Sequence, residues 1–97
     1  MARPKKTRII RREPEIRQFS PRGRIGRPGH MELKVEEFEA LSRADYMGQS
    51  QAEAAREMRI SQQTFSRVLK SGRKCLAEAL IRGLIIKIQG GSYKVAK

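Results

Sequence analysis

Four polar side chains between residues 62 and 67 fall at spacings that place them on one outward side of a helix. They are Gln62, Gln63, Ser66 and Arg67. A glutamine amide pairs in bidentate fashion with adenine, an arginine guanidinium does so with guanine O6 and N7, and a serine hydroxyl makes a shorter contact. These side chains are therefore predicted to contact DNA bases. The simpler alternative is a solvated helix face.

Further basic residues follow the candidate base contacts in the sequence, and Thr64 lies between two of the base contacts, Gln63 and Ser66. Lys70, Arg73 and Lys74 have the charge to meet phosphates, which contributes affinity but no sequence information. The hydroxyl of Thr64 is also expected to reach a phosphate. The alternative is that these charges only keep the protein soluble.

A second cluster of arginines lies in the run PRGRIGRP, residues 21–28. Arg22, Arg24 and Arg27 resemble the arginines of an AT-hook, an extended segment that lies in a narrow A·T minor groove, where negative potential attracts arginine. Ile25 stands where such a hook would have a second proline. Minor-groove insertion, looser phosphate contact and a structured role without DNA all stay open for this run.

The helix that must position the candidate base contacts belongs to the stretch QAEAAREMRISQQTFSRVLK, residues 51–70, which has the pattern of two helices around a tight turn. Apolar residues mark the facing sides of the two helices: Ala54, Ala55, Met58, Phe65, Val68 and Leu69. Ile60 is expected to fill the bend, and the Ser61 hydroxyl to accept from free N–H groups of the second helix. This is the helix-turn-helix pattern, although Arg59 stands where the turn commonly has glycine, at a cost of about 1 kcal/mol.

A preceding helix is predicted over residues 35–46. Its apolar residues follow a spacing of three: Val35, Phe38, Leu41 and Ala44. Gly48 is expected to end it in the left-handed conformation. Ser50 then caps a second helix over residues 51–58, and Glu53 completes a capping box.

The third helix is predicted to run from Ser61 to about Ile81. One apolar stripe follows it: Phe65, Val68, Leu69, Gly72, Cys75, Leu76, Ala79 and Leu80. Gly72 costs a helix about 1 kcal/mol relative to alanine, so a kink or break is expected there. Gly83 is a natural stop.

The two ends of the chain are predicted to be non-helical. Residues 1–30 hold all four prolines and read as a basic, largely extended arm, in which Arg8–Arg11 and Ile16–Phe19 could join a sheet. Residues 84–97 alternate apolar and polar side chains around Gly90-Gly91, which predicts a β-hairpin that docks on the helices, the arm or a second subunit. The expected fold is thus mainly α, with a three-helix domain over residues 31–83 between the arm and the hairpin.

The net charge points to a polyanionic partner. The chain has 97 residues, enough for a single core, and a formal net charge of +12. Ten Lys/Arg and two Glu give residues 1–30 a charge of +8, four against seven give 31–60 a charge of −3, and eight against one give 61–97 a charge of +7. Such segregation favours nucleic acid over an acidic membrane surface.

Several kinds of chemistry are not expected. Cys75 is the only cysteine and His30 the only histidine, so a four-ligand zinc site and an internal disulfide are both excluded within one chain. Cys75 is expected to pack as a small hydrophobe, and His30 to lie in a loop or cap. No catalytic grouping, signal peptide or membrane span stands out. We therefore predict a protein that is not an enzyme, needs no cofactor or metal, and is cytoplasmic and nucleoid-associated.

The chain resembles a small prokaryotic family of predicted DNA-binding proteins, domain-of-unknown-function family 134, whose helix-turn-helix is similar to region four of the sigma factors. The likeness runs from RPKKTRII through FEALSRAD to the Gly-Gly near the end, and is strongest over FEALSRADYMGQSQAEAAREMRISQQTFSRVL. Thr7 replaces a common cysteine, which argues against a metal role for the arm. Lys34 replaces a capping threonine, and Arg59 replaces the turn glycine. The resemblance implies a DNA-binding regulator.

The leading expectation is therefore a transcriptional regulator that binds double-stranded DNA, as a homodimer. Small core size and unpaired hairpin edges favour dimerisation. One alternative is a nonspecific DNA or RNA binder driven by the arm. Another is a protein-interaction module that contacts the transcription machinery.

Overall fold

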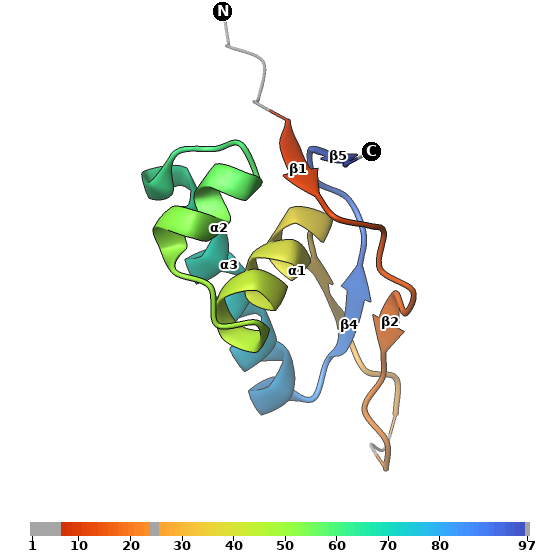
Figure 1. The fold of residues 1–97 in the computed structure, drawn as a ribbon. Coiled ribbons are helices and arrows are strands. Elements are labelled where there is room, and N and C mark those ends of the chain that lie inside the picture. Colours follow the sequence, from red (N-terminus) through yellow and green to blue (C-terminus); the bar gives the residue numbers. More distant parts are fainter. Residues whose placement is uncertain (1–6, 24–25, 97) are drawn as a thin grey trace, which may run out of the picture.

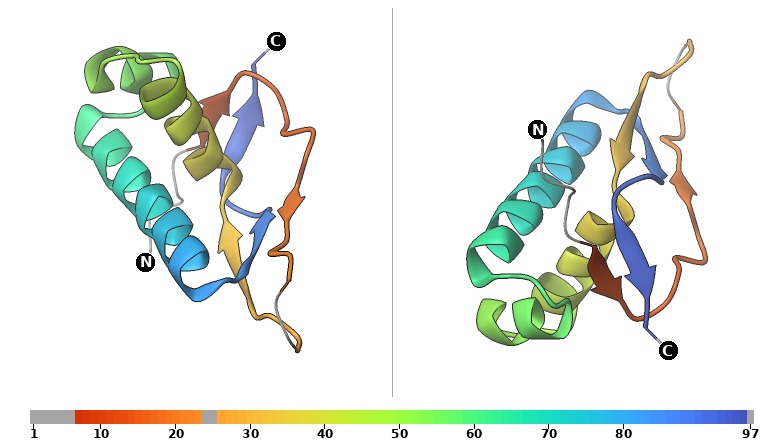
Figure 2. Two further views of the ribbon diagram at one scale, coloured as in Figure 1. Left: turned by 90° about the horizontal axis from the view of Figure 1, so that it is seen from below. Right: turned by 90° about the horizontal axis from the view of Figure 1, so that it is seen from above.

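The computed structural model describes residues 7–23 and 26–96, which form a layer of helices on one side of a layer of short strands (Figures 1 and 2). The elements, in chain order, are β1 (Arg8–Ile10), β2 (Gln18–Phe19), β3 (His30–Leu33), α1 (Val35–Leu41), the π-helical segment η1 (Ser42–Tyr46), α2 (Gln51–Glu57), α3 (Gln62–Arg82), β4 (Ile85–Ile88) and β5 (Tyr93–Val95).

The predicted helices are confirmed almost to the residue. α1 and η1 together cover the expected 35–46, and α2 and α3 match the expected second and third helices. Gly48 has φ +77° and Gly83 has φ +65°, so both adopt the left-handed conformation expected after a helix. The Ser50 hydroxyl accepts from the backbone N–H of Glu53 at 3.1 Å, which is the expected N-cap of α2.

α3 runs without a break through Gly72, so the break expected there is wrong. The reason lies in the packing against α1. A Cβ at position 72 would stand 3.2 Å from the Cβ of Glu37 and 3.4 Å from the Cδ1 of Leu41. Glycine therefore fits position 72 because α1 and α3 approach closely there.

The predicted C-terminal hairpin is wrong, because β4 and β5 do not pair with each other. β4 lies between β2, to which it is antiparallel, and β3, to which it is parallel; β5 pairs in parallel with β1. Gly90 and Gly91, with φ +77° and +94°, carry the chain past the start of α1 instead of turning it back. A Cβ on Gly91 would overlap Oε1 of Glu36, which accepts from the Ser92 N–H at 2.7 Å.

The N-terminal segment takes part in both sheets. β1 and β2 fall within the two stretches that the sequence predicts as extended, Arg8–Arg11 and Ile16–Phe19. The strand β3 is not predicted by the sequence pattern, which favours a loop or cap at His30 and a helical domain from Met31. In the structure Met31 and Leu33 face the core and His30 and Glu32 are exposed, an alternation that identifies a strand.

Two apolar clusters hold the layers together. The first joins α1, α2 and the start of α3 around fully buried Phe65 and Met58, as predicted for Phe65. The second joins α1 and α3 to the strands through Ile10, Leu33 and Ile88. The buried stripe of α3 ends before its predicted limit: Leu80 is 75% exposed.

Candidate nucleic-acid interface

The connection between α2 and α3 is a tight, internally bonded turn. Arg59 adopts φ +57°, the left-handed conformation that this position was expected to need despite its side chain. The backbone N–H of Ile60 donates to the carbonyl of Ala55 at 3.0 Å, and the Ile60 side chain is buried. The Ser61 hydroxyl accepts from the N–H of Thr64 at 3.0 Å, which confirms it as the N-cap of α3. The start of α3 is therefore held in a defined orientation.

The structure brings the predicted base-contacting residues together on one exposed surface. Gln62, Gln63, Ser66 and Arg67 are all exposed and lie in the first two turns of α3. Phe65, between them in sequence, is fully buried and fixes which way this surface faces. We call these four residues the reading face.

The cations predicted to meet phosphates are placed in two different ways. Lys70 and Lys74 are exposed and continue the row that begins with Gln63 and Arg67, opposite the buried side of α3. Arg73 is held by Asp45 at the end of η1: Nη2 lies 2.6 Å from Oδ1 and Nε lies 3.0 Å from Oδ2. This bidentate hydrogen bonding from Arg73 holds the pKa of the Asp45 carboxyl below its ordinary value. Arg73 therefore has to leave Asp45 before it can bind a phosphate.

Thr64 is half-buried beneath the cap of α3. Its Oγ1 accepts a hydrogen bond from the Ser61 hydroxyl at 2.9 Å. The Thr64 hydroxyl hydrogen is then directed away from Ser61 and is available as a donor.

Two exposed arginines beside the turn were missed by sequence reasoning. Arg56 lies in the last turn of α2, and Arg59 occupies the left-handed turn position. Across the described residues, neither forms an ion pair. The sequence did contain a signal for Arg59. A residue held at positive φ in a tight turn projects its side chain from the bend, and this bend lies next to the reading face. In the sequence, Arg59 stands out only as a departure from the glycine common at this position.

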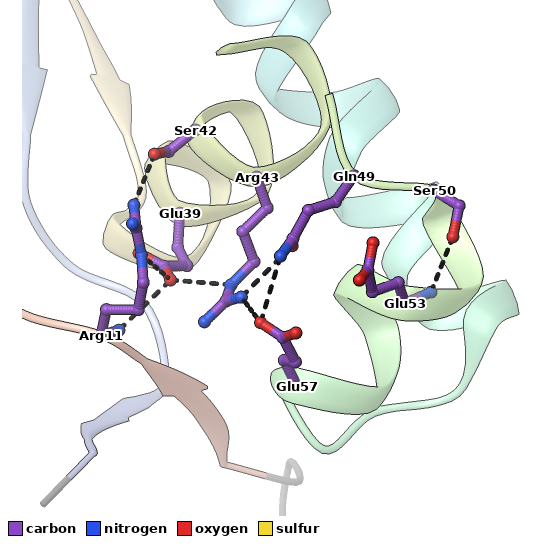
Figure 3. Close-up of polar contacts among 8 residues, drawn as sticks. All are labelled: Arg11, Glu39, Ser42, Arg43, Gln49, Ser50, Glu53 and Glu57. Atoms are coloured by element: carbon purple, nitrogen blue, oxygen red, sulfur yellow. Dashed lines mark hydrogen bonds and ion pairs between the residues drawn. The ribbon is translucent and has the colours of Figure 1, made fainter. Parts of the chain in front are cut away.

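A network of charged and polar side chains around buried Arg43 connects α1, η1 and α2 (Figure 3). Nε of Arg43 lies 2.8 Å from Oε2 of Glu39, and Nη1 of Arg43 bonds to Glu57 of α2 and to Gln49. Hydrogen bonds from Gln49 and then Arg43 hold the pKa of Glu57 below its ordinary value. The network links η1 to the last residue of α2 and to the loop before α2.

Two arginines of the N-terminal segment form ion pairs with glutamates of α1. Nε of Arg11 lies 3.3 Å from Oε2 of Glu39, and Nε of Arg8 lies 3.4 Å from Oε2 of buried Glu36 (Figure 3 shows the Arg11 contact). The backbone N–H of Ile9 donates to the carbonyl of Met58 at 3.0 Å, next to the α2–α3 turn. Part of the charge segregation in the sequence thus reflects internal pairing, so these arginines are not free cations for DNA.

The described residues of the arginine-rich run 21–28 lie near the end of α3 that is farther from the reading face. Arg22 and Arg27 are exposed, and Arg24 lies outside the described residues. The carbonyl of Gly29 accepts from the N–H of Ile85, three residues beyond the end of α3, at 2.9 Å. α3 has 21 residues and so rises about 30 Å between its ends. The structure therefore does not bring Arg22 or Arg27 to the predicted base contacts.

Three further observations concern Cys75, metal ligands and membrane-spanning helices in the described part of the chain. Cys75 is buried as predicted, and burial, followed by the charges of Glu37 and Glu78, raises the pKa of its thiol. No group of three or more His, Cys, Asp or Glu side chains there could hold a metal ion. None of the described helices is long and apolar enough to cross a membrane.

The fold and the reading face define a small basic protein built around a capped pair of helices, and comparison with known proteins identifies its family. The chain belongs to the family described as "Protein of unknown function DUF134", whose profile matches residues 1–96. A UPF0251 protein of Halothermothrix orenii is 45% identical over 98 residues, which span 100% of this chain and 73% of that protein. UPF0251 proteins of Desulfosudis oleivorans and Methanococcus maripaludis are each 46% identical, over 96% of this chain and 68% and 72% of their own lengths.

These matches confirm the family that the sequence resembles. No solved structure matches this chain.

Proposed function

We propose that this protein is a DNA-binding transcriptional regulator, in which α2 and α3 form a helix-turn-helix and the start of α3 enters the major groove. In such motifs the N-terminal residues of the second helix contact base edges. The observation that carries the proposal is the reading face: Gln62, Gln63, Ser66 and Arg67 are exposed together on the first turns of a capped helix.

The cations around the reading face support the same proposal. Arg56 and Arg59 flank it on the side of α2, and Lys70 and Lys74 continue it along α3. A major groove is bordered by phosphates on both sides, so exposed cations on both sides of a reading helix match its charge. Binding to the chromosome would follow from this activity.

The first experiment is selection of bound duplexes from a random DNA pool, followed by titration of the selected site. We expect a preferred sequence, and we expect Gln63→Ala and Arg67→Ala to relax preference at one or two base pairs, each at a cost of about 1–3 kcal/mol. Arg27→Ala is the matched control, because it removes the same charge as Arg67→Ala at the far end of α3. If Arg67→Ala and Arg27→Ala leave base preference equally intact, the reading face is not the specificity surface.

A salt titration separates phosphate contacts from base contacts. Lys70→Ala should weaken binding to all sequences alike and reduce the slope of log K against log salt by about one unit. An RNA duplex and a scrambled DNA duplex belong in the same series. Equal affinity for the selected DNA site, the scrambled DNA duplex and the RNA duplex would favour the nonspecific nucleic-acid binder over the regulator.

A further inference from the structure

The strands β1 and β5 form a two-stranded parallel sheet beside the α2–α3 turn, and we call this sheet the ribbon. The backbone groups of Arg8 and Ile10 bond to the segment 92–96, so those of Ile9, between them, point to the other edge of β1. There the N–H of Ile9 donates to the carbonyl of Met58, the residue that ends α2, at 3.0 Å. The turn, β1 and β5 therefore lie side by side in that order. Figure 1 shows the ribbon at the same end of the molecule as the α2–α3 connection.

One face of the ribbon is fixed to the helices and the other faces solvent. On the inner face Ile10 is fully buried, and Nε of Arg8 lies 3.4 Å from Oε2 of Glu36 in α1. Side chains alternate along a strand, so Ile9 and Lys94, which are in register, share the outer face. Lys94 is exposed and has no ion pair among the described residues. The ribbon is thus a rigid support that presents a cation beside the turn.

The spacing of the ribbon from the turn matches the distance from a major groove to its phosphates. Neighbouring strands lie about 4.8 Å apart, and the hydrogen bond between Ile9 and Met58 places the turn at a similar spacing from β1. The backbone of Lys94 therefore lies about 10 Å from that of Met58. The major groove of B-DNA is about 12 Å wide. An element offset by about 10 Å from a helix in that groove meets the bordering phosphates and not the bases.

The sequence that flanks the ribbon is uniformly basic. Residues 1–7 and 92–97 contain no Asp or Glu and five Lys or Arg: Arg3, Lys5, Lys6, Lys94 and Lys97. All of these except Lys94 lie outside the described residues, but the covalent chain limits how far they can be from the ribbon. Arg3 precedes Ile9 by six residues, so the Cα atoms of the two residues are within about 21 Å of each other. Cations this close to a bound duplex add attraction to phosphates without reading sequence.

We propose that the ribbon is a second DNA contact, in which Lys94 and the basic residues before Thr7 bind the phosphates next to the groove that α3 enters. The proposal rests on the proposed function, because the duplex is the one held by the reading face. The basic residues that accompany the reading face on DNA are then those beside the turn, and not those of the run 21–28.

The test is the salt dependence of binding to the selected DNA site by Lys6→Ala/Lys94→Ala. We expect the slope of log K against log salt to fall by about two units, affinity at low salt to fall by about tenfold or more, and base preference to stay unchanged. Arg22→Ala/Arg27→Ala is the matched control, because it removes the same charge near the far end of α3 and should keep the wild-type slope. A slope for Lys6→Ala/Lys94→Ala equal to that of the control overturns the proposal.

Hydroxyl-radical footprinting of the wild-type complex tests the contact without a variant and so remains informative if the double variant unfolds. We expect protected sugars outside the base pairs whose preference Arg67→Ala relaxes. This protection should be lost in Lys6→Ala/Lys94→Ala and kept in Arg22→Ala/Arg27→Ala. A footprint confined to the base pairs that the reading face controls contradicts the ribbon contact.

The two proposals fail in different ways. If Arg67→Ala relaxes base preference while Lys6→Ala/Lys94→Ala behaves as the control does, only the ribbon contact is refuted. If Lys6→Ala/Lys94→Ala lowers the salt slope while Arg67→Ala leaves base preference intact, the phosphate contact at the ribbon is supported and the reading face is refuted.

Discussion

Arg73 illustrates how a side chain of suitable type and spacing can already be engaged. The helical spacing predicts a phosphate contact for Arg73. In the structure, however, its Nε and Nη2 both donate to the Asp45 carboxylate. Arg67 and Lys70 on neighbouring turns have no such partner within the described residues. Predicted contacts along α3 therefore differ in how freely they can reach DNA.

Asp45→Asn should strengthen DNA binding, because it removes the carboxylate that holds Arg73. We expect a gain of about two- to fivefold at low salt and a steeper salt slope. Glu78→Gln makes the same change of charge farther along α3 and should have a smaller effect. An Asp45→Asn variant that binds no better than Glu78→Gln would mean that Arg73 stays away from the duplex.

The pH dependence of the Asp45–Arg73 pair has a definite sign. Arg73 lowers the pKa of Asp45, so the pair is intact above the ordinary value of 3.8 and is lost only as the pH falls through the lowered value. Between about pH 5 and 8, DNA affinity should not change through this pair.

At the scale of the helices, Gly72 and the buried Arg43 network fix how α1, α2 and α3 fit together. Gly72 faces α1, and Arg43 bonds to Glu39, Gln49 and Glu57, none of which belongs to the reading face. Changes to them should therefore act on stability first.

Gly72→Ala should destabilise the fold by about 1–2 kcal/mol, although alanine is the better helix former. The new methyl group would press on Glu37 and Leu41, which are held by the packing of α1. Chemical denaturation measures the effect. Ala77→Gly on the exposed side of α3 is the control, and its loss of about 1 kcal/mol reports helix propensity alone. A stabilised Gly72→Ala protein would show that α1 can yield at this contact.

Arg43→Ala should cost about 3–5 kcal/mol, since it leaves buried Glu39 without its closest cation. The double variant with Glu39→Met should recover part of this loss, because no uncompensated buried charge then remains. Arg12→Ala, at an exposed position, should lie within about 0.5 kcal/mol of the wild type. Thermal or denaturant unfolding of the four proteins decides it, and equal losses for Arg43→Ala and Arg12→Ala would contradict the role of the network.

The helices were predictable from the sequence because their signals are local. Ser50, Ser61 and Gly83 act within one turn of the helix ends that they mark, and the apolar spacing of Phe65 and Val68 assigns the buried side. The strand partners were not predictable, since alternation at β4 and β5 identifies a strand but not its neighbour. The same limit applied to the interface: the outward direction of the reading face followed from periodicity, whereas the Asp45–Arg73 pair depends on a distant segment.

At the scale of the whole molecule, the two ends of α3 present different surfaces. The reading face occupies one end, and the exposed Arg22 and Arg27 lie beside the other. For one protomer to contact DNA with both surfaces, the duplex would have to follow α3 for about 30 Å.

The double variant Arg22→Ala/Arg27→Ala should therefore leave affinity for a single half-site within about twofold and base preference unchanged. Arg56→Ala/Arg59→Ala removes the same charge beside the turn and should weaken binding by about tenfold or more at low salt. Fluorescence titration of both variants measures the contrast. A larger loss from the first variant than from the second would restore minor-groove insertion by the run 21–28.

The parallel pairing of β1 with β5 has a consequence for folding during translation. Ile10 is fully buried, yet its partner in the sheet is Val95, which follows it by 85 residues in the chain. A nascent chain emerging from the ribosome thus holds its helices before it holds the strand that closes the sheet. Non-local pairing of this kind is slow to form, so the β1–β5 sheet is completed only after Val95 has been translated.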